Sequence, residues 1–276
     1  MSQPKSTGKE TCSAQSWRSR LTSLLVNQVK NAAKQMLPQR IYVKMRSELM
    51  GENGCPGFDW AHFCSLRRVD PIRRDCGWQS GQPIDRYYTE AVFLPQYVDD
   101  IHGRVLEIGD DRYTRLFGGG QVLHSDVLHL KSGSSEATLI ADLTNADHIP
   151  SGTFDCIILT FTLQFVYDVR SAIRTLYRIL KPGGVLLATF HGISQIARYD
   201  MEMWGEYWRF TTLSTQMLFS EVFPKECITV QSYGNVLTAL ASLHGIHSTE
   251  LRRDELDFYD RDYEVVVAAR VLKPVP

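Results

Sequence analysis

The stretch from Gly103 to Gly120, GRVLEIGDDRYTRLFGGG, constrains the fold of this chain more than any other part of the sequence. Its short apolar run, Val105 to Ile108, contains one acid, Glu107, and ends one residue before Gly109. Such a run is typical of a buried strand in a parallel sheet, which is covered on both faces. Gly109 lets the backbone turn sharply and approach a ligand, because it has no Cβ. Together these features predict a pocket for a nucleoside or an amino acid at the end of the strand.

The size and composition of the chain fit an enzyme-sized globular domain. Its 276 residues are enough for one large α/β domain with extensions. A hydrophobic content of 43% supports a substantial core, and a net charge of −1 gives no indication of a nucleic-acid partner. No apolar run approaches 18 residues, and the N-terminus lacks the apolar core of a signal peptide. We therefore expect a soluble, cytoplasmic protein.

Cysteine spacing does not favour a metal site. The six cysteines include no CxxC pair. Cys156 and Cys227 lie in strand-like runs, so we expect them to be small core side chains. Cys55, Cys64 and Cys76 are too widely spaced for a typical zinc site, and no metal is expected.

The N-terminal part differs from the remainder in charge. Residues 1–16 are polar and are expected to form a disordered tail. Residues 17–80 are expected to form a basic amphipathic helix and a connector, and residues 81–276 the main domain. Residues 1–46 carry a net charge of +8. The helix within residues 17–46 therefore either contacts an anionic membrane surface weakly or caps the domain as a solvated helix.

Alternating strand and helix patterns predict the fold of the main domain. Tyr88 to Val98 suits a helix that leads into the first strand. Further strands are expected at 121–128, 137–141, 154–160, 185–190, 227–233 and 263–272, with helices at 168–180 and 214–223. The predicted fold class is α/β: a Rossmann-like, doubly wound, seven-stranded sheet, mostly parallel with an antiparallel last strand, plus the N-terminal helical extension.

Acids at two further strand ends suit a nucleoside. Asp126 lies 19 residues beyond Glu107, at or near the expected end of the second strand, where a carboxylate can accept hydrogen bonds from both ribose hydroxyls. Asp142 follows the third strand and could accept from an adenine amino group, while Leu143 packs on the ring.

Several motifs carry a resemblance to a known family. VLEIG at the first strand, and LKPGG between a helix and an apolar strand at 180–184, resemble class I S-adenosylmethionine-dependent methyltransferases. The loop Gly109-Asp110-Asp111 departs from the family's usual alternating glycines. QPIDRYY, RVLEIGDD, LKPGGVLLAT and YWRFT together resemble one bacterial group associated with glycan or natural-product biosynthesis. A nicotinamide dehydrogenase is disfavoured because G-x-G-x-x-G is missing.

The resemblance implies a cofactor site and a lid. S-adenosylmethionine, with S-adenosylhomocysteine as its product, would contact a set of residues that begins at the first strand: Glu107, Gly109, Asp126, Asp142, Leu143, Thr160, Gln164 and Tyr87. Thr160 and Gln164 would lie near the methionine ammonium. Arg86, Tyr87 and Tyr88 would form a lid, or the two tyrosines would simply pack their helix onto the sheet.

Catalytic and acceptor residues are assigned from the loop chemistry. His191 follows the fifth strand and is the candidate general base for a hydroxyl acceptor, with Tyr88 and Asp85 as alternatives. An aromatic loop is the candidate acceptor site, through Trp204, Tyr207, Trp208 and Arg209.

The predicted function is O-methylation of a sugar or glycosylated small molecule. A polyketide or aromatic natural product is the alternative acceptor. A non-methylating relative, either a cyclase or a cofactor-binding partner protein, is the alternative from another class.

Overall fold

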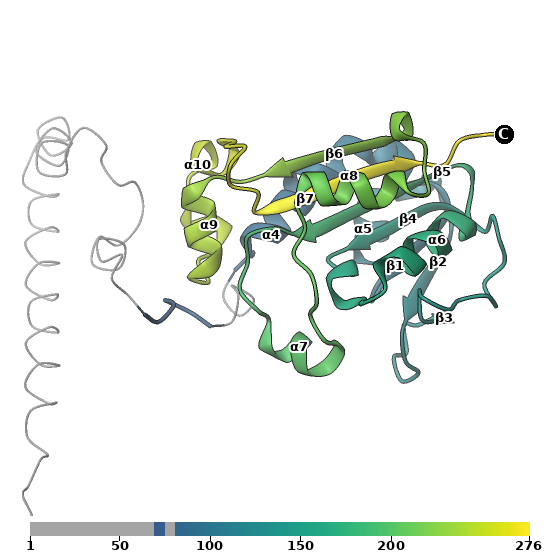
Figure 1. Ribbon diagram of the computed structural model, residues 1–276, viewed down its shortest axis with the longest axis horizontal. Helices are drawn as coiled ribbons and strands as arrows, with labels where there is room; N and C mark the ends of the chain where they lie inside the picture. Colours follow the sequence, from purple (N-terminus) through teal and green to yellow (C-terminus); the bar gives the residue numbers. More distant parts are fainter. Residues whose placement is uncertain (1–68, 75–80) are drawn as a thin grey trace, which may run out of the picture. The chain divides into compact units, whose positions relative to one another are not determined.

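A seven-stranded sheet organises the part of the chain that the computed structural model describes, residues 69–74 and 81–276 (Figure 1). The predicted tail, the basic helix of residues 17–46, and Cys12, Cys55, Cys64 and Cys76 lie outside the described residues. The same holds for most of the predicted connector.

The strand order reverses in the middle of the sheet. The strands are β1 (Gly103–Ile108), β2 (Val122–His129), β3 (Leu139–Ile140), β4 (Phe154–Thr160), β5 (Leu180–His191), β6 (Ile228–Tyr233) and β7 (Val266–Leu272). Their order is β3-β2-β1-β4-β5-β7-β6. β1 to β5 run parallel, and β7 is antiparallel to both of its neighbours. The predicted fold class is confirmed, and the reversal between β1 and β4 marks the edge at which such sheets bind ligands.

Helices cover both faces of the sheet (Figure 1). They are α4 (Ile84–Tyr87), α5 (Arg112–Phe117), α6 (Val169–Ile179), α7 (Arg198–Trp204), α8 (Thr212–Ser220), α9 (Val236–Leu243) and α10 (Arg253–Asp257). A π-helical turn, Tyr88–Phe93, and a 3-10 segment, Leu94–Asp100, continue α4 toward β1. Shorter 3-10 turns lie at Gly119–Gln121, Leu163–Phe165, Lys225–Cys227 and Ser248–Glu250.

The central strands alternate between two apolar layers. Leu106 of β1 packs in the layer that α6 and α8 cover. Its neighbour Val105 packs in the opposite layer, with Phe93 and Tyr113. Both strand faces are therefore buried, as the continuous apolar runs predict for a parallel sheet. Cys156 of β4 is fully buried in the second layer.

Several elements differ from the sequence predictions. β5 begins at Leu180, so LKPGG forms the start of a long strand rather than a separate turn. The register with β4 shifts there, because Phe154 pairs with Leu180 but Cys156 pairs with Val185. β2 extends to His129, beyond its predicted end. The apolar segment after β6 forms α9, which a capping box of Asn235 and Thr238 begins.

Candidate functional site

Two adjoining cavities lie where β1, β4 and β5 end. The larger has a volume of about 600 Å³ and the smaller about 250 Å³. Both are lined by Ile108, Thr160, Phe161 and Phe165. Because β1 and β4 flank the point where the strand order reverses, the cavities occupy the ligand-binding edge of this kind of sheet.

Gly109 forms the turn that the sequence predicts at the end of β1. Its φ is +91°, a backbone conformation that favours glycine, and no atom lies within 4 Å of the position where a Cβ would be. Its N–H donates to the carbonyl of Leu128 on β2 at 3.1 Å. The residue lines the larger cavity, so a ligand there can approach the backbone closely.

Glu107 fixes the helix that follows this turn. It is 2% exposed and accepts hydrogen bonds from the backbone N–H groups of Tyr113 and Thr114, at 3.0 and 2.8 Å, and from the Thr114 hydroxyl at 2.8 Å. Burial raises the pKa of Glu107 to about 7, although these donors act in the opposite direction. Glu107 also lines the smaller cavity, so it combines a helix-capping role with a place in the site.

Asp142 and Leu143 lie in the larger cavity, as the resemblance implies. One oxygen of Asp142 accepts from the backbone N–H and hydroxyl of Thr144, both at 2.8 Å, which orients the carboxylate. Leu143 is 5% exposed and packs against the apolar layer beneath the cavity.

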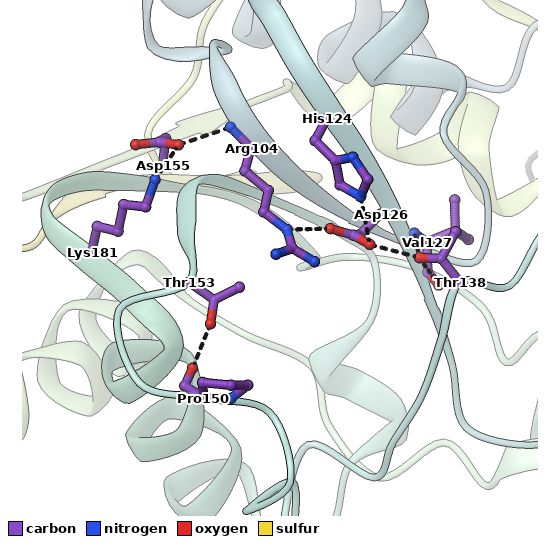
Figure 2. A network of polar contacts seen from close by, with 9 residues as sticks. All are labelled: Arg104, His124, Asp126, Val127, Thr138, Pro150, Thr153, Asp155 and Lys181. Atoms are coloured by element: carbon purple, nitrogen blue, oxygen red, sulfur yellow. Dashed lines mark hydrogen bonds and ion pairs between the residues drawn. The ribbon is translucent and has the colours of Figure 1, made fainter.

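Asp126 does not lie where the sequence places it. It is inside β2, is 3% exposed and lines neither cavity. Figure 2 shows its carboxylate held by Arg104 at 2.7 Å and by the Thr138 hydroxyl at 3.0 Å. Burial opposes ionisation, but these hydrogen bonds lower the pKa of Asp126. The strand instead ends at His129, which lines the larger cavity and which the sequence analysis missed.

The loop after β4 joins the two cavities. Phe161 has a φ of +45°, an uncommon conformation for a residue with a Cβ and one that clusters at functional sites. Gln164 is fully buried, and its Nε2 donates to the carbonyl of Phe161 at 2.7 Å. Among the described residues, Gln164 Oε1 has no hydrogen-bond partner. Gln164 lines the smaller cavity, but this oxygen is itself buried, so a ligand reaches it only after the side chain moves.

His191 lies in the smaller cavity with Asp85 of α4. Its Nε2 is 3.0 Å from Asp85 Oδ2, and its Nδ1 is 3.4 Å from Gln164 Nε2. The imidazole also stacks on Phe161, with ring centroids 4.5 Å apart. The sequence names His191 and Asp85 as separate candidates, and the structure brings them together.

The two tyrosines of the predicted lid pack the structure instead. Tyr88 is 2% exposed, and its hydroxyl donates to the carbonyl of Leu256 at 2.8 Å. The Tyr87 hydroxyl donates to Asp257 at 2.7 Å. Neither lines the two cavities, which favours the alternative that these tyrosines pack their helix onto the domain. Arg86 does line the smaller cavity and pairs with Glu90 at 3.4 Å.

The aromatic loop divides into two pairs of residues. Trp204 and Tyr207 line the larger cavity. Trp208 and Arg209 line neither it nor the smaller one. Trp208 donates to the carbonyl of Val166 at 3.1 Å, and Arg209 donates to the carbonyl of Gln195 at 2.7 Å. These two residues therefore brace the loop that carries α7 beyond the strand ends (Figure 1).

Comparisons with known proteins give a family match over β2 to β5. Residues 121–188, from the start of β2 into β5, match a family described as a methyltransferase domain. The ubiquinone/menaquinone biosynthesis C-methyltransferase UbiE of Haemophilus ducreyi is 32% identical over 108 residues, which cover 36% of this chain and 35% of that protein. UbiE of Escherichia coli O1:K1 is 36% identical over 88 residues, 28% of this chain and 35% of that protein. The match thus spans about a third of these relatives.

Solved structures of methyltransferases are similar to part of the chain at low identity. A putative sarcosine dimethylglycine methyltransferase from Galdieria sulphuraria has 10% identity and a TM-score of 0.46, and covers 68% of this chain and 86% of that chain. The N-methyltransferase NodS of Bradyrhizobium japonicum WM9, in complex with S-adenosylhomocysteine, has 15% identity and a TM-score of 0.44, and covers 74% and 95%.

Proposed function

We infer that this chain, which carries a class I methyltransferase domain, transfers a methyl group from S-adenosylmethionine to a small-molecule acceptor. One observation carries the inference: two cavities share Thr160 and Phe161 at the edge of the sheet where the strand order reverses. The larger is of a size that suits a nucleoside ligand, and the smaller contains an imidazole. A donor and an acceptor can therefore meet beside His191.

The residues around the larger cavity fit S-adenosylmethionine. Gly109 leaves its backbone open to a close approach, and Asp142 with Leu143 offers a carboxylate and an apolar surface for adenine. Thr160, which lines both cavities, and Gln164, which lines the adjoining smaller one, are the candidates near the methionine ammonium. His129, at the end of β2, takes the place beside the ribose that the sequence assigned to Asp126. When bound, S-adenosylmethionine supplies a methyl group on a sulfonium.

The acceptor that we propose is a sugar or a glycosylated small molecule, methylated on oxygen. Polar side chains line the smaller cavity, including Asp85, Arg86, Asp110 and Asp200. Such groups suit hydroxyl-bearing acceptors, because carboxylates accept and guanidinium groups donate hydrogen bonds. His191 is the candidate base that removes the hydroxyl proton. An aromatic natural product is the alternative acceptor, because Phe161 and Phe165 line both cavities. The names of the sequence relatives make carbon the alternative acceptor atom.

The test of the donor site is calorimetric titration of S-adenosylmethionine and S-adenosylhomocysteine into the full chain and into Asp142→Ala. We expect binding by the wild type and a loss of about tenfold in the variant, because one charge-assisted hydrogen bond contributes about 1.4 kcal/mol or more. Asp147→Ala is the matched control, since Asp147 is exposed and lines neither cavity. Absence of binding by the wild type would refute the proposed activity and favour a non-methylating relative.

A second measurement distinguishes the acceptors. Transfer of labelled methyl from S-adenosylmethionine to a panel of glycosides, phenols and quinols separates the proposed acceptor class from the aromatic and carbon alternatives. We expect the label in an ether of a glycoside. Transfer to carbon, or to aglycone phenols alone, would contradict the proposed acceptor while leaving the methyltransferase activity in place.

A further inference from the structure

The backbone that carries His191 is held on both sides. His191 pairs with Val266 of β7, and its carbonyl accepts from the N–H of Phe210 at 2.9 Å. The next residue, Gly192, approaches β7 so closely that a Cβ would lie 2.0 Å from the carbonyl oxygen of Glu264. The position of the imidazole in the cavity is therefore fixed by the sheet.

Asp85 is fixed from a distant part of the chain. It belongs to α4, which Ile84 anchors with 2% exposure, and Asp85 Oδ1 accepts from the backbone N–H of Arg86 at 2.7 Å. That bond leaves Oδ2 directed at His191 Nε2, 3.0 Å away. The Phe161 ring, inclined by 24° to the imidazole, restricts rotation of the imidazole from one face.

These contacts assign the neutral tautomer of His191. An ionised carboxylate can only accept a hydrogen bond, so Nε2 must carry the proton that lies between it and Asp85. The lone pair of the neutral imidazole is then on Nδ1. Its neighbour, Gln164 Nε2, makes its shorter hydrogen bond, 2.7 Å, to Phe161 and lies 3.4 Å from Nδ1. Nδ1 is consequently the weakly engaged, basic nitrogen.

We propose that Asp85 is a positioning residue that holds His191 in its Nε2–H form, so that Nδ1 is the atom that takes the proton from the acceptor hydroxyl. This inference rests on the proposed function. The O–H bond of the acceptor breaks as an N–H bond forms at Nδ1. The oxygen electron pair forms the bond to the methyl carbon while the carbon–sulfur bond breaks, and sulfur keeps that pair as a thioether. The imidazolium returns the proton to water.

The test reads the tautomer directly, without an acceptor. Long-range nitrogen–proton correlation spectra of the full chain, labelled with nitrogen-15 histidine, distinguish a protonated from an unprotonated ring nitrogen. His191→Gln assigns the signals among the eight histidines. At a pH where the imidazole is neutral, we expect the Nε2–H form in the wild type and averaged signals of both tautomers in Asp85→Asn, whose amide can donate as well as accept.

Two variants make the result specific. Asp85→Glu keeps a carboxylate and is expected to keep the Nε2–H form. Asp99→Asn changes an exposed residue on the same segment before β1, and its spectrum is expected to be the same as that of the wild type. An Nδ1–H form in the wild type, or an unchanged tautomer in Asp85→Asn, would overturn the proposal.

Kinetics and binding separate this inference from the proposed function. With a hydroxyl-bearing acceptor that the wild type methylates, Asp85→Asn is expected to lower kcat by about tenfold or more. The KM for S-adenosylmethionine is expected to stay unchanged. A lack of S-adenosylmethionine binding by the wild type refutes the methyltransferase activity whatever the tautomer. A retained kcat in Asp85→Asn refutes only the positioning role.

Discussion

At the scale of single residues, the carboxylates of this sheet have contrasting environments. Within residues 69–74 and 81–276, Glu107 receives three hydrogen bonds, all from the first turn of α5 and none from a cation. Asp126 receives a charged hydrogen bond from Arg104, the residue whose backbone N–H also donates to Asp155 (Figure 2). The pKa of Glu107 is consequently raised by burial, whereas the pKa of Asp126 is lowered by its partners despite burial.

This contrast predicts opposite pH dependences of stability. Because the pKa of Glu107 rises from 4.5 to about 7 on folding, ionising it opposes folding increasingly as the pH rises through that range. We therefore expect the unfolding free energy of Glu107→Gln, minus that of wild type, to increase as the pH is raised from about 5 to about 8. The increase should be about 3 kcal/mol at most, and urea denaturation at several pH values measures it.

Asp126→Asn is the control for that measurement. Because folding lowers the pKa of Asp126, its ionised carboxylate stabilises the folded protein at pH values above the ordinary pKa of aspartate. This contribution is lost only as the pH falls through the lower pKa of the folded state. Its difference from wild type should thus change much less than the Glu107→Gln difference over that range, because His124, which lies 3.4 Å from the Asp126 carboxylate, is 60% exposed and its interaction is screened by solvent. A constant difference for Glu107→Gln would contradict the raised pKa.

The positions of some candidate site residues were predictable from the sequence. Gly109, Asp142 and Gln164 lie at the cavities as expected. Asp126 does not, because the spacing of acids along the chain gives no information on where a strand ends. The pairing of His191 with Asp85 joins residues 106 positions apart, and no local pattern predicts it. Which tyrosines pack and which line a cavity also depends on α10, a distant element.

At the scale of elements, the first residues of β5 are held by several close contacts. Lys181 pairs with Asp155 at 2.7 Å, and Gly183 has a φ of +81°. A Cβ on Gly184 would lie 2.9 Å from the carbonyl oxygen of Lys181 and 3.0 Å from that of Asp155. The KPGG motif therefore permits a register shift within a strand, which explains why it reads as a break in the sequence.

We expect Gly184→Ala to lower the unfolding free energy by about 1–3 kcal/mol, because the backbone must move to admit the methyl group. Gly120→Ala is the matched control: its φ is not positive, and no atom lies within 4 Å of its Cβ position. Urea denaturation of both variants makes the comparison. Equal stabilities would show that the strand accommodates a Cβ without strain.

Element types were predictable where the apolar period was strong. β4 has the predicted bounds, and α6 lies within the predicted helix 168–180, with Asp168 as its N-cap. α9 was missed because its run, VLTALASL, is apolar on most sides and shows no helical stripe. Tertiary packing decides such a segment, since Ala239 and Ala241 are buried against Ile84 and Tyr88.

At the scale of the whole molecule, the basic N-terminal segment remains a separate prediction. None of the helices in residues 69–74 and 81–276 is long and apolar enough to cross a membrane. A peripheral contact through residues 17–46 would depend on charge, at about 1 kcal/mol for each Lys or Arg near an anionic surface. Pelleting with phosphatidylserine vesicles should therefore show about 30-fold weaker binding of Lys30→Gln/Lys34→Gln than of wild type.

The control for the vesicle measurement changes two charges elsewhere. Lys225→Gln/Arg261→Gln alters exposed residues of the sheet domain and should leave vesicle binding unchanged. Equal binding of the Lys30/Lys34 variant and wild type would favour the alternative, a solvated helix that caps the domain.

The position of β7 between β5 and β6 has a consequence for how the chain matures. β5 and β6 have no direct pairing, and each completes its hydrogen bonding only when residues 266–272 insert between them. While β7 has not yet left the ribosome, β5 and β6 of the nascent chain have unpaired strand edges, which are aggregation-prone. It also lacks Val265, which lines the smaller cavity, and Val266, which pairs with His191. The proposed proton-accepting site is therefore completed only when β7 has paired, and ribosome-bound or truncated chains that end before residue 266 should need chaperone protection and lack activity.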